Sequence, residues 1–311
     1  MGSGYKTREL SETLRELAVR ALLYEVSATI KPGLVDRMNC GAHTDMDFYT
    51  FVDSGVKLGQ YFGAITESIE KTYERGGVDF KEANLIFEML KYHGQRAEQM
   101  MLEVTKGINT HKGAIFSFGL ITGASMELLL LNSRIEGQND KLFTDSGTFL
   151  FQLRNRIQSY MIPEMASFFK ALKEPHTYGE KQYLSLGLTG ARGEAASGYE
   201  SIFKFGLPAL KRSLNQGLSL NDAMVQTLLS FMAHVEDSNV MGRRDRRTLE
   251  ESQAKAHSIL STGGMECDEG KKMVINYDAW CIRENISHGG CADLMAATVF
   301  LHLIENKFFE K

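Results

Sequence analysis

Residues 79–104 read DFKEANLIFEMLKYHGQRAEQMMLEV, and apolar side chains recur in them at intervals of three and four positions. This is the period of an α-helix, and it lines one face with apolar residues, as in a helix that packs on a core. Asp79 can cap the helix while Glu82, three residues later, returns a hydrogen bond, which is a capping-box pattern. We therefore predict an amphipathic helix whose inner face carries Ala83, Ile86, Leu90, Ala97, Met100 and Val104.

The same spacing recurs along most of the chain, whereas strand-like alternation is nearly absent. No linker rich in proline, serine or charge divides the sequence, and no segment repeats at the periods typical of repeat proteins. We predict an all-α fold, a multi-helix bundle of roughly ten helices in a single domain over residues 1–311. The predicted helices cover residues 8–26, 47–73, 79–104, 113–131, 147–172, 193–214, 220–235, 246–260, 269–284 and 292–303.

The composition is that of a soluble globular protein, with 43% hydrophobic and 24% charged residues. A net charge of −4 disfavours non-specific binding to nucleic acid or to anionic membranes, so anionic ligands need local sites. The four cysteines lack metal-ligand spacing, and the N-terminus carries no apolar run like a signal peptide, which favours a reduced cytoplasmic location. No stretch reaches the ~18 to 20 unbroken apolar residues of a membrane span.

Glycine-rich joints separate the predicted helices, and several of them open a helix. Glycine lets the backbone approach a ligand closely, and a helix N-terminus stabilises an anion through its free N–H groups and its dipole. The joints are therefore candidate phosphate sites. They are residues 31–37 (KPGLVDR), 107–113 (GINTHKG), 190–194 (GARGE) and 287–293 (SHGGCAD).

In the second joint, Asn109 or Thr110 can cap the helix while His111 and Lys112 supply donors that suit a phosphate chain. The alternative is an ordinary capped helix start with a solvated lysine. In the third joint, Arg192 has the planar fork that grips phosphate bidentately. Alternatively, Arg192 pairs with Glu194 on the surface. No Gly-Lys-Ser/Thr follows this joint, which excludes a P-loop.

The joints also contain acidic residues. Mg²⁺ usually binds through one or two carboxylates together with substrate phosphates. Each acid taken singly is more often a cap or an ion-pair partner. Glu25 extends the apolar stripe of Leu14 and Ala18, which places it toward the interior, where it needs a partner. The acids at or beside the joints are Glu25, Asp36, Asp45, Glu194, Glu236, Asp237 and Asp293.

Residues 236–244 end an apolar helix with two acids, a placement that opposes the helix dipole and indicates either a site or a local ion pair. Asn239 and Arg243 follow. The histidines His43, His111 and His288 lack the spacing of a zinc site. Neither Cys40 nor Cys291 has an adjacent base that would mark it as a nucleophile.

Taken in order, the joints resemble the triphosphoribosyl-dephospho-CoA synthase family. The resemblance runs from about Ala21 to Leu301, with only generic helix at about 59–106 and 131–183. The residues that carry it are Glu25-Val26-Ser27 with residues 31–37, Gly41-Ala42-His43 with Asp45-Met46, Asn109-Thr110-His111-Lys112-Gly113, Gly187-Leu188-Thr189-Gly190-Ala191-Arg192-Gly193-Glu194, Asp237 with Asn239-Val240, and Gly289-Gly290 with Ala292-Asp293-Leu294.

The resemblance implies a transferase that moves the triphosphoribosyl group of ATP onto 3′-dephospho-CoA and releases adenine. The product would be 2′-(5″-triphosphoribosyl)-3′-dephospho-CoA, a prosthetic-group precursor for the acyl carrier protein of citrate lyase or malonate decarboxylase. It would pass to a phosphoribosyl-dephospho-CoA transferase that acts on that carrier protein. The sequence is compatible with a homodimer. At two places the chain departs from the family pattern, with Arg244-Asp245 in place of two glycines and His288 in place of proline.

Cleavage of an N-glycosidic bond builds positive charge on the sugar, so the reaction needs a stabilising carboxylate, an acid for adenine and a base for the acceptor hydroxyl. Glu25, Glu194 and Asp293 are the candidates for these catalytic roles. Lys112, Arg192 and Arg243 are assigned to the phosphates, and Asp36, Asp237 and Asp45 to Mg²⁺. Further substrate contacts are expected from Lys31, Asn109, His111, Gly190, Gly193, Asn239, Gly289 and Gly290.

Two other functions fit the same residues. A nucleoside or ADP-ribose N-glycoside hydrolase would use nearly the same site with water as the acceptor. A non-catalytic helical nucleotide-binding protein would need only the amphipathic helices, although acids clustered at glycine joints argue against it.

Overall fold

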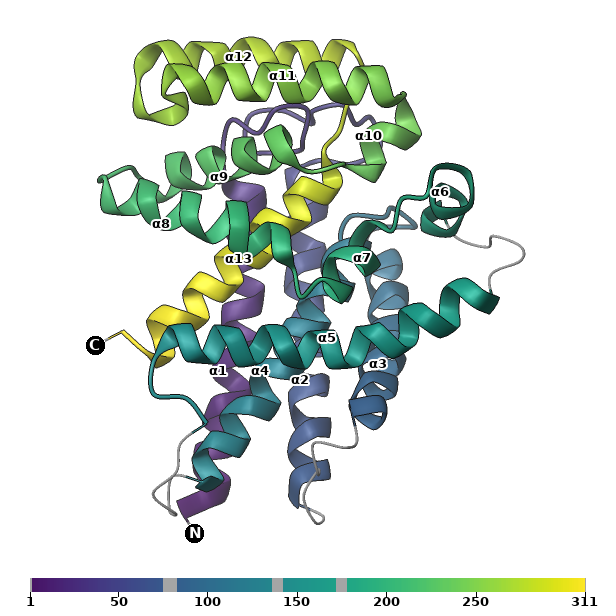
Figure 1. Cartoon of the computed structure of the whole chain (residues 1–311), viewed down its shortest axis with the longest axis vertical. Coiled ribbons are helices and arrows are strands. Elements are labelled where there is room, and N and C mark those ends of the chain that lie inside the picture. The colour runs from purple at the N-terminus through teal and green to yellow at the C-terminus, as the bar shows by residue number, and fades with distance from the viewer. Residues whose placement is uncertain (1, 75–82, 136–141, 172–177, 311) are drawn as a thin grey trace.

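The computed structural model describes residues 2–74, 83–135, 142–171 and 178–310, and within these ranges the regular elements are all helical (Figure 1). The predicted all-α class is therefore confirmed. The α-helices are α1 Gly2–Ser27, α2 Phe48–Glu74, α3 Ala83–Val104, α4 Lys112–Ile135, α5 Ser146–Ala171, α6 Tyr178–Leu186, α7 Gly190–Ala196, α8 Leu207–Asn215, α9 Leu220–His234, α10 Ser238–Arg243, α11 Arg246–Thr262, α12 Asp268–Arg283 and α13 Gly289–Phe308.

Most predicted helices match an observed one, with three differences. The short helices α6 and α10 were not predicted, because fewer than three turns carry too little periodicity to stand out. The single helix predicted over residues 193–214 is broken into α7, a π-helical turn at Ile202–Gly206, and α8. Gly198 and Tyr199 interrupt it with φ of +70° and +57°, which no helix contains. The Asp79 cap lies outside the described residues.

The two most apolar helices, α4 and α13, form the centre, as expected for helices that are hydrophobic on all sides. They meet through Phe118 and Phe300, whose rings stack 5.0 Å apart. Among the described residues, α4 is also the one helix long and apolar enough to cross a membrane by length and composition, but 83% of that window is buried within the protein. Burial to this extent is typical of a helix in the core of a globular protein.

The other long helices surround this centre. In Figure 1, α1, α2 and α3 run beside α4, and α5 crosses the bundle. The helices α9, α11 and α12 form a second tier near the start of α13, whereas α8 packs on α9 and reaches the end of α13 through Lys211 and Glu305. The 28–47 segment lies beneath α12, where Asp278 accepts hydrogen bonds from the Gly33 amide at 2.9 Å and from Asn39 Nδ2 at 3.0 Å. The starts of α4 and α13 consequently face this segment.

Candidate active site

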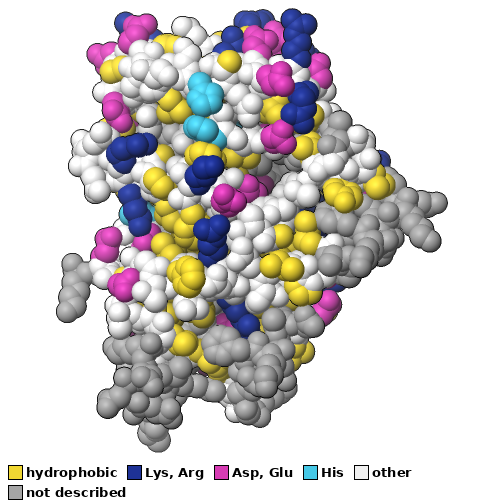
Figure 2. Space-filling model, in the orientation of Figure 1, with side chains coloured by type: hydrophobic (Ala, Val, Ile, Leu, Met, Phe, Trp, Pro, Cys, Tyr) yellow, Lys and Arg dark blue, Asp and Glu magenta, His cyan; other side chains and the backbone are white. Residues whose placement is uncertain are grey.

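Two adjoining pockets open where the helix joints meet, and Asp293 lines both. The first pocket, of about 350 Å³, lies between the end of α1, the 28–47 segment and the starts of α4 and α13. The second pocket, of about 430 Å³, lies between the 187–201 segment, the end of α9 and the start of α13. On the face drawn in Figure 2, acidic side chains gather beside a hollow. The predicted joints therefore meet in one site with two compartments.

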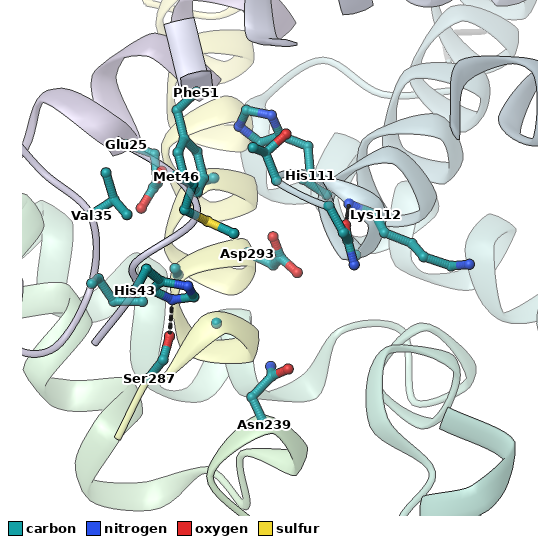
Figure 3. Close-up of a pocket in the computed structure, with 18 of the residues that line it drawn as sticks. Glu25, Val35, His43, Met46, Phe51, His111, Lys112, Asn239, Ser287 and Asp293 are labelled. Atoms are coloured by element: carbon teal, nitrogen blue, oxygen red, sulfur yellow. Dashed lines mark hydrogen bonds between the residues drawn. The ribbon is translucent and has the colours of Figure 1, made fainter. Parts of the chain in front are cut away.

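Asp293 lies one turn after the start of α13, and the Ala114 amide at the start of α4 donates a hydrogen bond to it. Burial raises the pKa of this carboxyl group well above its usual range, and the negative charges of Glu25 and Asp237 raise it further. The raised pKa favours the protonated form of this carboxyl group, which is the form a proton donor needs. Figure 3 shows it in the middle of the first pocket.

Glu25 and Lys31 form a buried ion pair at the wall of the first pocket, with 5% and 1% of each residue exposed. The predicted inward position of Glu25 is confirmed, and its partner is Lys31. Burial raises the pKa of Glu25 more than the ammonium group lowers it, and Asp36 adds to the rise. The pair holds the turn after α1 against the pocket.

The start of α4 is capped as expected, because Asn109 Oδ1 accepts a hydrogen bond from the Lys112 amide at 3.2 Å. Asn109, His111 and Lys112 all line the first pocket. The Lys112 ammonium group, however, lies 2.9 Å from Glu98, and Figure 3 shows its side chain extending away from Asp293. The helix start, more than this ammonium group, faces the cavity.

Arg243 and Asn239 reach the opposite side of the first pocket from α10. Arg243 donates to the Ala42 carbonyl at 3.0 Å and to Asn285 Oδ1 at 3.3 Å. Gly289, at the start of α13, lies close to Asn239, since a Cβ atom there would be 3.0 Å from Asn239 Nδ2. The structure thus brings these predicted contacts together around one cavity.

Glu194 lines the second pocket. Its carboxylate accepts the Ser201 hydroxyl at 2.5 Å, and burial raises its pKa although the Ser201 hydrogen bonds oppose the rise. Gly190, Gly193 and Gly290 line the same pocket, and Gly190 has φ of +53°. The side chain of Arg192 is not among the lining groups of either pocket, so the geometry gives no support to its predicted role as a phosphate clamp.

The three acids assigned to Mg²⁺ are not brought to one place. Asp36 accepts the amides of Lys31, Met38 and Asn39 and lines neither pocket. Asp237 lines the second pocket, capping α10 and accepting the Cys291 amide at 2.9 Å. Asp45 lies at the first pocket with 61% of its side chain exposed. The described residues contain no group of three or more His, Cys, Asp and Glu that could hold a metal ion.

The departures from the family pattern lie beside the pockets but outside their walls. His288 is fully buried, and its Nε2 lies 2.9 Å from Ser252 Oγ. Burial lowers the pKa of His288 to about 4, although Asp237 opposes the fall. Arg244 contacts Glu284 at 3.4 Å, and Asp245 caps α11. These side chains support helix ends.

Two residues that sequence reasoning missed are Tyr199, which lines the second pocket, and Ser54, which contacts a residue of the first. Tyr199 is buried beside the second pocket at a positive φ, a position that for a bulky residue marks a constrained site. The preceding Gly198, which also has a positive φ, was the sequence feature that could have indicated a break in the helix here. Ser54 lies within α2 and contacts His111 across 57 positions of sequence. No local sequence pattern indicates a contact between residues so far apart in the chain.

Comparison with known proteins places the chain in one family. The model of the ATP:dephospho-CoA triphosphoribosyl transferase family matches residues 11–310. A probable 2-(5″-triphosphoribosyl)-3′-dephosphocoenzyme-A synthase of Streptococcus equi subsp. zooepidemicus is 35% identical over 303 residues, covering 97% of this chain and 99% of that protein. A protein of the same printed name from Vibrio cholerae is 36% identical over 306 residues, covering 98% and 92%.

A 2-(5″-triphosphoribosyl)-3′-dephosphocoenzyme-A synthase of Escherichia fergusonii is 35% identical over 289 residues, covering 93% of this chain and 89% of that protein. No solved structure matches the chain. Because the family model and these relatives extend over nearly the whole sequence, the chain belongs to the ATP:dephospho-CoA triphosphoribosyl transferase family.

Proposed function

We propose that the chain carries out the reaction of its family in the two adjoining pockets, with Asp293 between the two substrates. The reaction moves the triphosphoribosyl group of ATP to 3′-dephospho-CoA and releases adenine. The observation that carries this proposal is that both pockets share Asp293, a carboxyl group whose raised pKa favours its protonated form. Two nucleotide substrates and one proton donor between them are what the transfer requires.

The atoms balance with one acid and one base. The bond between C1′ of the ATP ribose and adenine breaks, and C1′ bonds to the 2′-oxygen of dephospho-CoA. We assign proton donation to adenine to Asp293. Glu194, which lies in the second pocket, is assigned to the proton of the acceptor hydroxyl. Glu25 is less suited to either role because it is engaged with Lys31.

The first pocket offers the groups that a triphosphate needs. The start of α4 and the start of α13 present helix N-termini to it, and Arg243 adds a cation. Mg²⁺, bound to the phosphates, would neutralise part of their charge. Asp45 fits such an ion best, because it lies at this pocket with an exposed carboxylate, and Mg²⁺ commonly takes one or two carboxylates beside phosphates.

The product retains a 5″-triphosphate, and a triphosphate is an activated donor. We therefore propose that a transferase acting on an acyl carrier protein consumes it, as in the maturation of citrate lyase or malonate decarboxylase. The free state of the four cysteines supports a reducing, cytoplasmic location for this pathway.

Incubation with ATP, Mg²⁺ and dephospho-CoA tests the proposal directly. We expect free adenine and a CoA-derived product heavier by one triphosphoribosyl group, both detected by mass spectrometry. Adenine released equally well without dephospho-CoA would instead identify an N-glycoside hydrolase. ATP binding with no adenine under either condition would identify a non-catalytic nucleotide-binding protein.

The variant Glu194→Gln tests the proposed base. We expect turnover to fall by about 10²-fold or more, since general-base help contributes that much, while the KM for ATP changes little because ATP binds in the other pocket. Glu250→Gln on the exposed surface of α11 is the matched control. Ordinary turnover in the Glu194 variant would exclude the role.

Gly113→Ala tests the contact between Asp293 and the start of α4. A Cβ atom at this position would lie 2.0 Å from Asp293 Oδ2, so the carboxyl group has to move. Alanine favours helix, so we expect the Tm to stay close to that of the wild type. Turnover should fall by ~10-fold or more, equivalent to ~1.4 kcal/mol of transition-state stabilisation.

The control for this variant is Gly94→Ala in α3, where the Cβ atom meets only Tyr61 Oη at 3.7 Å. Adenine release and circular-dichroism melting should be compared for both variants. Wild-type turnover in the Gly113 variant would show that the close approach of Asp293 to α4 is dispensable.

A further inference from the structure

His111 occupies an unusual position in the first pocket. The residue is 3% exposed, and its ring meets Phe51 edge-on at 5.0 Å. Its Nδ1 lies 2.7 Å from Ser54 Oγ, whereas its Nε2 has no hydrogen-bond partner among the described residues. Figure 3 shows the ring beside the cavity that His111 lines. A buried polar nitrogen without a partner is costly, so this one marks a place for a ligand atom.

The hydrogen bonds around Ser54 determine which ring nitrogen carries the proton. Thr110 Oγ1 donates to Ser54 Oγ at 2.8 Å. A hydroxyl has one proton, and Ser54 is fully buried, so its proton goes to His111 Nδ1 as the adjacent acceptor. Nδ1 is then the unprotonated nitrogen, and Nε2 holds the N–H. In the opposite tautomer, Ser54 Oγ would face two donors and leave its own proton without an acceptor.

The ring is also neutral. Burial lowers the pKa of His111 to about 3, and the charge of Lys31 contributes to the fall. Protonation would require Nδ1 to donate toward Ser54, which the Thr110 hydrogen bond opposes. The imidazole is therefore a donor at Nε2 without a net charge.

We propose that Thr110 and Ser54 hold His111 in the Nε2–H tautomer, so that it donates a hydrogen bond to a phosphate oxygen bound in the first pocket. Phosphate is the acceptor class because His111 directly precedes α4, whose N-terminus faces the same cavity. The identity of this acceptor rests on the proposed function, whereas the tautomer does not. Ser54 and Thr110 act here as positioning residues, and His111 touches the substrate.

Nitrogen NMR of the protein labelled with ¹⁵N-histidine tests the tautomer without any substrate. Loss of one ring pattern in His111→Gln assigns the signal among the eight histidines. At neutral pH we expect the His111 ring to show the Nε2–H pattern. Ser54→Ala should convert it to a mixture or to the Nδ1–H pattern. Thr110→Ser keeps the hydroxyl and should keep the wild-type pattern, whereas Thr110→Val should shift it partly.

Kinetics test the donor role. The amide nitrogen of glutamine can replace Nε2–H, whereas that of asparagine lies near Nδ1, so His111→Gln should retain at least tenfold more kcat/KM for ATP than His111→Asn. Ser54→Ala should raise the KM for ATP several-fold with a smaller change in kcat. Melting curves confirm that each variant is folded.

Three results would overturn the proposal. An Nδ1–H pattern for His111 in the wild type would contradict the tautomer, and an unchanged pattern in Ser54→Ala would contradict the role of Ser54. Equal activity of the glutamine and asparagine variants would remove the donor role. An Nε2–H pattern in a protein that releases no adenine would instead contradict the proposed function while leaving the tautomer in place.

Discussion

Replacement of Asp293 by asparagine is expected to lower turnover by about 10²- to 10⁴-fold, the range that general acid catalysis contributes. Asparagine matches the neutral form of the carboxyl group in shape and cannot give up a proton to adenine. The fold should survive, because burial of Asp293 already disfavours its charged form. Single-turnover adenine release measures the chemical step, and the KM for ATP separates it from binding.

The pH dependence of stability distinguishes a catalytic role of Asp293 from a role in stabilising the fold. A carboxyl group whose pKa is raised on folding keeps its proton while the unfolded chain loses it, so the free energy of unfolding falls as pH rises above the ordinary value of 3.8. The free energy of unfolding stops falling once the pH exceeds the pKa of Asp293 in the folded protein. Asp293→Asn removes this penalty and should be at least as stable as the wild type at pH 7. A variant that is both inactive and markedly less stable would contradict this.

Replacement of Lys31 by methionine should cost about 3–5 kcal/mol of unfolding free energy, because it leaves the buried carboxylate of Glu25 without its partner. Removing the ammonium group raises the pKa of Glu25 further, so the loss should grow as pH rises above 4.5, the ordinary value for this group. Denaturant unfolding at pH 5 and at pH 8 measures both effects.

The double variant Glu25→Gln with Lys31→Met is the control, since it removes both charges from the interior. It should recover most of the stability, and the double-mutant cycle gives the coupling between the two groups. If turnover returns with stability, the pair supports the pocket without taking part in the reaction. If stability returns without turnover, Glu25 or Lys31 acts on the substrates. A single Lys31 variant as stable as the wild type would show that the pair is not held as described.

The sequence predicted several features of the site because they depend on neighbours along the chain. Helical periodicity placed Glu25 on the inner face of α1, and the cap by Asn109 follows from its position before α4. Glycines at the joints marked where ligands could approach the backbone. The joints also carried Asp293 and Glu194, to which the family resemblance gave catalytic roles, and the structure places both at the pockets.

The roles of individual side chains were harder to predict from the sequence, because many depend on which other groups the side chain contacts in the folded protein. Lys112 has the spacing of a phosphate ligand, yet Glu98 from α3 takes its ammonium group. Asp36 resembles a metal ligand in its joint, yet three amides of its own turn occupy its oxygens. A carboxylate looks the same in sequence whether it accepts backbone N–H groups or faces a cavity.

By itself, then, the sequence determined that the chain is helical, which stretches form most of its long helices, and which joints carry cations and acids, because these depend on spacing within a few turns. Only the tertiary structure decided that Asp293 lies within reach of the charges of Glu25 and Asp237 and lines two pockets. That arrangement raises its pKa through burial and charges contributed by segments more than 50 positions away, and no local period records how distant helices pack.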